Sequence, residues 1–131
     1  MRRSLARRWR SAALLVVFVS ACSRNKTGTE EFYPRVDPIP VHVMNENFLD
    51  MNVYVVSSGV SRRLGLVSGN GAGDFKIAWS LASGQSISLT AVPIGGRGSA
   101  VSGSLNVSPG QAIEFKIGSV LRQSSAVVVT P

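Results

Sequence analysis

Residues 51–68 read MNVYVVSSGVSRRLGLVS, and this stretch decides the fold class. From Met51 to Val55 every second residue is apolar, which is the period-two pattern of a half-buried β-strand. Ser58-Gly59 follows, a pair typical of a two-residue hairpin turn. In the returning run, residues 60–68, Leu64 and Leu66 are two positions apart, so both are expected to point to the same face of the strand. The stretch therefore predicts two neighbouring antiparallel strands.

Short apolar runs of the same kind continue from Ile39 to Pro131, and Gly, Pro, Asn or Ser closes nearly every one. In the run that ends at Ser108-Pro109-Gly110, Val101, Leu105 and Val107 are predicted to share one face. A strand about every 8–12 residues without helical periodicity is typical of a sandwich. We therefore predict an all-β domain, an antiparallel two-sheet β-sandwich of seven or eight strands, immunoglobulin-like or transthyretin-like. The remaining runs are residues 39–44, 75–79, 86–91, 113–117 and 126–129.

The basic charge of the chain is concentrated at its start. The formal net charge is +7, yet five arginines and no acidic residue lie within residues 1–10. The rest of the chain is close to neutral, so the charge does not indicate a nucleic-acid partner. The apolar run Ala12–Val19 that follows would span only ~12 Å as a helix, too short to cross a membrane of ~30 Å. A basic start and a short apolar run predict a signal peptide.

The end of this segment, Val19-Ser20-Ala21-Cys22, resembles the lipobox of bacterial lipoprotein signal peptides. The resemblance implies cleavage between Ala21 and Cys22 and a lipid on Cys22, which would attach the protein to a membrane. The predicted organisation is a signal peptide over residues 1–21, a lipidated cysteine and flexible stalk over 22–38, and the β-sandwich over 39–131. The stalk prediction rests on a polar composition without apolar periodicity.

The expected location is the bacterial cell envelope. In lipoproteins of two-membrane bacteria, an Asp after the lipidated cysteine is typical of retention at the inner membrane, and this chain has Ser23 there. The resemblance therefore favours the outer membrane, at its periplasmic face or at the cell surface. The route of export, Sec or twin-arginine, stays open.

The sequence offers little for catalysis or metal binding. The chain has one His and one Cys, and the lipobox resemblance commits Cys22 to the lipid. His42 alternates with Val41 and Val43, so it is expected on the solvent face of its strand. The acidic residues are scattered, and Asp50 with its neighbouring asparagines does not form the dense pattern of a calcium loop. We predict no metal site, no cofactor and no enzymatic activity.

One loop is a candidate binding site. Gly95, Gly96, Arg97 and Gly98 combine exposed backbone N–H groups with a fixed positive charge, a combination that suits a phosphate or carboxylate. A plain turn between two strands explains the same residues. Another glycine-rich loop, Gly69–Gly73, is the second surface expected to take part in recognition.

Most of the domain resembles a small β domain that recurs in uncharacterised bacterial envelope proteins. The residues that carry the resemblance are 45–56, 63–67 and 93–99. The resemblance supports the fold and implies no activity, ligand or catalytic residue.

The expected function is that of a non-catalytic protein-binding or structural module on a lipid-anchored envelope lipoprotein, with an envelope protein as partner. The alternative is a small-ligand or carbohydrate binder, for which Trp79, Tyr54 and Phe48 are the candidate aromatic residues. The oligomeric state is not readable from the sequence.

Overall fold

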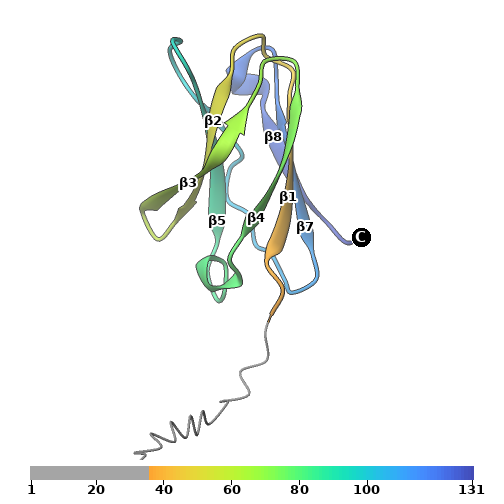
Figure 1. Ribbon diagram of the computed structural model, residues 1–131. Helices are drawn as coiled ribbons and strands as arrows, with labels where there is room; N and C mark the ends of the chain where they lie inside the picture. Colours follow the sequence, from red (N-terminus) through yellow and green to blue (C-terminus); the bar gives the residue numbers. More distant parts are fainter. Residues whose placement is uncertain (1–35) are drawn as a thin grey trace, which may run out of the picture. The chain divides into compact units, whose positions relative to one another are not determined.

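The computed structural model describes residues 36–131, and it confirms the two-sheet β-sandwich (Figure 1). The predicted signal peptide, Cys22 and most of the stalk lie outside the described residues. One sheet has the order β4-β1-β7-β8 and is called the β1 sheet; the other has the order β3-β2-β5-β6 and is called the β2 sheet. The strands are β1 (Ile39–Asn45), β2 (Met51–Ser57), β3 (Val60–Val67), β4 (Ala72–Ile77), β5 (Ile87–Pro93), β6 (Ala100–Val101), β7 (Ala112–Ile117) and β8 (Ser125–Val129).

Between the strands, the described residues contain two short 3-10 turns, η1 (Trp79–Leu81) and η2 (Leu121–Gln123). Within residues 36–131 there is no helix with the length and apolar character needed to cross a membrane.

Alternate residues of the two sheets face one another and form one hydrophobic core. In β1, for example, Ile39, Val41 and Val43 are buried, while His42 is exposed on the outer face as predicted. Phe115 of β7 is the largest of the fully buried side chains. The two sheets thus hold each other in place through their inner faces, which is how a sandwich buries its apolar residues.

The β2–β3 hairpin forms as predicted, but β3 contains an irregularity. Ser58 and Gly59 both have positive φ, 49° and 78°, as a two-residue hairpin turn requires. Further along, Gly65 pairs with Val53 and Arg63 pairs with the next residue of β2, so Leu64 has no partner. The two leucines of this strand therefore do not share a face: Leu64 packs against the core, whereas Leu66 is 46% exposed.

The strand pairing is antiparallel with one exception. β1 and β7 run parallel, with Val41 opposite Ile113 and Asn45 opposite Ile117. Parallel neighbours need a long connection, and here the chain passes through the whole β2 sheet between the two strands. Such a long-range pairing leaves no mark on the local pattern of either strand.

The predicted face of Val101 is wrong. Ala100 is fully buried and Val101 is 50% exposed, whereas Leu105 and Val107 are buried as expected. β6 is only two residues long, and Gly103, at a φ of 78°, interrupts the extended run. The alternation of buried and exposed side chains shifts by one residue at Gly103. Every second residue therefore does not stay on the same face across this interruption.

Candidate functional site at the loop end

Four connections gather at one end of the sandwich, the end reached by β1 at Asn45 (Figure 1). They are residues 46–50, 68–71, 94–99 and 118–124, and together we call them the loop end. The chain enters the sandwich at the opposite end, where β1 begins.

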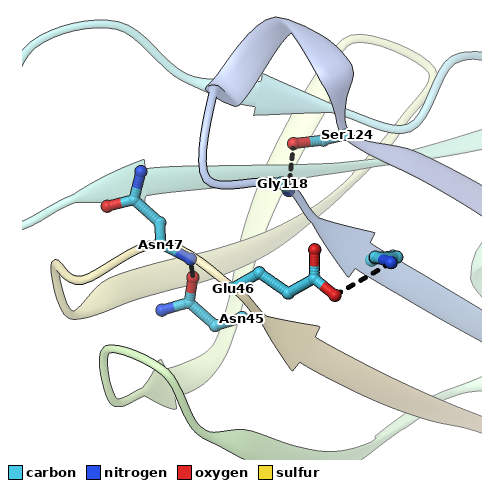
Figure 2. A network of polar contacts seen from close by, with 6 residues as sticks. Asn45, Glu46, Asn47, Gly118 and Ser124 are labelled. Atoms are coloured by element: carbon cyan, nitrogen blue, oxygen red, sulfur yellow. Dashed lines mark hydrogen bonds and ion pairs between the residues drawn. The ribbon is translucent and has the colours of Figure 1, made fainter.

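Asn45 forms the centre of the loop end. It is 1% exposed, and its Nδ2 donates to the carbonyl oxygens of Leu49 and Ser68 at 2.8 and 3.0 Å. Its Oδ1 accepts a hydrogen bond from the backbone N–H of Asn47 at 3.0 Å (Figure 2). Because every polar atom of a buried carboxamide needs a partner, these bonds fix the first two loops relative to each other.

Asn47 extends the network to the last loop of the domain. Its Nδ2 donates to the carbonyl oxygen of Ser119 at 2.8 Å, and its Oδ1 accepts from the N–H of Leu49 at 3.0 Å. The last loop has its own internal bond, from the Gly118 N–H to the Ser124 hydroxyl oxygen at 3.0 Å (Figure 2). Nearby, an ion pair of 2.8 Å joins Glu46 to Lys116 of β7.

The two glycine-rich loops, residues 68–71 and 94–99, are held by further contacts. The Gly69 N–H donates to Asp50 Oδ1 at 2.8 Å, and the Ile94 N–H donates to the Asp50 carbonyl oxygen at 2.9 Å. A Cβ on Gly69 would lie 2.1 Å from the carbonyl oxygen of Phe48, which requires a glycine there. All four loops are thus linked by hydrogen bonds to buried or backbone groups, so the loop end is a preorganised surface.

Three large apolar side chains are exposed among the polar residues of these loops. Phe48, Ile94 and Val120 come from three different loops and are 76%, 50% and 49% exposed. Leu49, the neighbour of Phe48, turns inward and packs against the core instead. Exposed aromatic and aliphatic side chains held at fixed positions are suited to contact another macromolecule.

The predicted binding loop lies at the loop end. Gly95, Gly96, Arg97 and Gly98 are all exposed, and two of these glycines have positive φ. The second predicted surface, Gly69–Gly73, starts at the same end and then continues into β4. The structure therefore brings together two loops that the sequence singled out separately.

The sequence did not single out the loop of residues 46–50 as a candidate surface. The sequence drew attention to Asp50 and its neighbouring asparagines only for a calcium pattern that they do not form, and to Phe48 only as a candidate aromatic of a small-ligand or carbohydrate site. In the structure the polar residues serve as the internal frame, and Phe48 is the exposed tip. The available signal was an aromatic residue inside a run of Asn, Glu and Asp, a composition that favours turns over core.

The three candidate aromatic residues do not gather in one place. Phe48 lies at the loop end, Tyr54 on the outer face of the β2 sheet, and Trp79 in η1 at the opposite end. Trp79 is partly buried and packs against the core. These three residues therefore do not form one aromatic platform.

His42 lies in an exposed row of charged side chains on the outer face of the β1 sheet. Its Nδ1 is 2.7 Å from Asp74 Oδ1, with the two side chains 44% and 85% exposed, and Glu114 is its partner on the other side in the strand register. Among residues 36–131 no three His, Cys, Asp or Glu side chains form a group that would hold a metal ion.

No family model and no curated protein matches this chain. One solved structure, described as the NMR structure of the protein from Eubacterium rectale, is similar to it with a TM-score of 0.44 and 10% sequence identity. The similarity covers 76% of this chain and 95% of that chain. A likeness at this level says nothing about function.

Proposed function

We propose that this chain is a lipid-anchored envelope lipoprotein whose β-sandwich is a non-catalytic module that binds another envelope protein through its loop end. The observation that carries the proposal is the exposure of Phe48, Ile94 and Val120 on a frame of buried asparagines. The membrane attachment rests on the lipobox resemblance around Cys22.

Preorganisation is the physical reason for favouring this end. Ordering a flexible loop on binding costs about 0.5–1.5 kcal/mol for each immobilised side chain that has many rotamers. The bonds from Asn45 and Asn47 order these loops before any partner arrives. An exposed aromatic on such a surface is the kind of residue that dominates the energy of protein interfaces.

The position of the loop end fits the same proposal. The chain enters the sandwich at Val36, next to β1, and the loops lie at the other end of the strands (Figure 1). A domain tethered through that entry point keeps its loop end free to meet a partner.

The proposal is tested with a photoreactive amino acid placed at Phe48 in living cells. We expect ultraviolet light to join the protein covalently to one envelope protein. The matched control carries the same group at Val60, which is 68% exposed at the opposite end of the sandwich. Equal products from both positions, or none from Phe48, would contradict binding through the loop end.

The membrane attachment has a separate test. Replacing Cys22 with Ala removes the thiol that would receive the lipid, so the precursor should stay uncleaved or the protein should leave the membrane fraction. Unchanged processing and unchanged membrane retention would disprove the lipid anchor and leave the loop-end proposal untouched.

A further inference from the structure

A sandwich has four sheet edges, and three of the edges here are protected against pairing with another strand. β3 carries Arg62 and Arg63 and is irregular at its unpaired residue. β4 carries Asp74 and Lys76, and β6 has only two residues. Charges, irregular pairing and short length are the usual ways in which proteins keep an edge from pairing.

The fourth edge, β8, has none of these features. Its sequence, Ser125–Val129, contains no charged residue, no glycine and no proline. Its pairing with β7 is regular along the whole strand, from Ala112 opposite Val129 to Lys116 opposite Ser125. On its other side, β8 has no neighbouring strand among residues 36–131. Its backbone N–H and C=O groups on that side are therefore available to a further strand.

The side chains of β8 are also incompletely covered. Val127 is 52% exposed on the outer face, although it lies in the middle of the strand. Ala126 and Val128 pack against the core but remain only partly buried. A strand added beside β8 would cover apolar area on both faces of the sheet.

We propose that β8 pairs antiparallel with β8 of a second copy of this chain, joining the two β1 sheets into one continuous sheet. Full overlap of Ser125–Val129 places the twofold axis at Val127, so this residue faces its own counterpart. Ser125 then lies opposite Val129 of the second copy. A twofold arrangement makes the same patch serve both partners.

The distribution of charge favours a second copy as the occupant. In the register of the β1 sheet, Asp74, His42, Glu114 and Val127 follow one another across four strands. Pairing between two β8 strands therefore puts only uncharged side chains opposite one another. The charged side chains lie on β4 and β7, farther from the new contact. Within residues 36–131, β8 is the one edge that is both neutral and long enough to match itself.

Antiparallel pairing is compatible with the proposed lipid anchor. This compatibility rests on the proposed function, and the pairing of β8 does not. His42 lies level with Val127 in the register, so each Val36, six residues before His42, would lie ~20 Å from the twofold axis along the strands, and the two entry points would be about 40 Å apart in that direction. The chain from Cys22 to Val36 can extend to ~46 Å at about 3.3 Å per residue, so both copies can reach one membrane.

Cysteine crosslinking in the full-length protein tests the proposal. Val127→Cys brings two thiols together across the twofold axis, where directly opposite Cβ atoms are about 4.5–5.5 Å apart. Oxidation of intact cells should convert most of this variant to a disulfide-linked dimer. Val101→Cys is the matched control, because Val101 is 50% exposed on the edge of the other sheet and should stay monomeric. The unaltered protein, with Cys22 alone, sets the background.

A second pair of variants measures the association itself. Val127→Glu would bring two glutamates face to face, each beside Glu114, so the detergent-solubilised protein should sediment as a monomer. Val101→Glu should sediment as a dimer, like the unaltered protein, and both variants should show a cooperative thermal transition. A monomeric unaltered protein, a Val127→Glu variant that remains dimeric, or a Val127→Cys product containing a different protein would overturn the proposal.

Discussion

The side-chain Nδ2 of Asn47 donates a 2.8 Å hydrogen bond to the carbonyl oxygen of Ser119, a residue 72 positions further along the chain. The bond joins the first loop of the sandwich to the last. Both residues belong to the loop end, so the geometry of that surface depends on a contact between the two extremes of the domain.

Asn47→Ala should destabilise the domain. The substitution removes two part-buried hydrogen bonds, one to the Ser119 carbonyl oxygen and one from the Leu49 N–H, and a typical hydrogen bond contributes about 0.5–1.5 kcal/mol. Urea unfolding followed by circular dichroism measures the change. Asn106→Ala, at an exposed asparagine, is the control and should unfold like the unaltered protein. Equal midpoints for the two variants would show that the bond does not hold the loops.

Gly69→Ala should also be destabilising, for a steric reason. The new methyl group would lie 2.1 Å from the Phe48 carbonyl oxygen, so one of the two loops must move. We expect a loss in the range of about 1–3 kcal/mol that is typical of forced shifts at tightly packed positions. The adjacent exposed Ser68 provides the comparison: Ser68→Ala should have no measurable effect in the same thermal unfolding experiment. If the two variants melt together, the close approach of the loops is wrong.

Leu89→Ala tests the core. Leu89 is fully buried in the β2 sheet, and removing such a side chain typically costs about 2–5 kcal/mol. Leu66→Ala makes the same chemical change in the same sheet at a position that is 46% exposed, and it should cost much less. The difference between the two unfolding free energies measures the burial of Leu89. Similar losses would contradict the assignment of inner and outer faces.

Phe48→Ser should leave the stability of the domain almost unchanged. Because Phe48 is 76% exposed, its loss should change the free energy of unfolding by no more than about 0.5 kcal/mol. Leu49→Ser, at the inward-facing neighbour, should be clearly destabilising. Unfolding curves in urea distinguish the two. A large loss of stability in Phe48→Ser would mean that the aromatic ring packs within the domain.

The fold was predictable wherever a local pattern determined it. The Ser58-Gly59 turn and the alternation around Val53 appear in the structure as the sequence indicated. Leu64 and Leu66 were expected on one face, and Val101 was expected on the face of Leu105. Both expectations were wrong, because an unpaired residue in β3 and the break after β6 shift the alternation by one residue. Such breaks depend on pairing with other strands, which a local pattern does not contain.

The candidate site was predictable only in part. Gly95 to Gly98 stood out because glycines mark exposed turns. The exposed position of Phe48 on an ordered loop did not, because the order of that loop depends on Asn45 and Asn47 bonding to loops 23 and 72 residues away in the chain. Only the folded arrangement brings those carbonyl groups within reach of the two asparagines.

The central position of β1 has a mechanical consequence. β1 is the strand through which the chain enters the domain, and it is hydrogen-bonded on both sides, to β4 and to β7. Tension applied at Val36 acts along the strand axis, so both ladders resist it together in shear and the bonds do not open one at a time. A partner held at the far end would pull along the same axis. The entry strand is thus placed to carry a load through the domain without peeling an edge from the sheet.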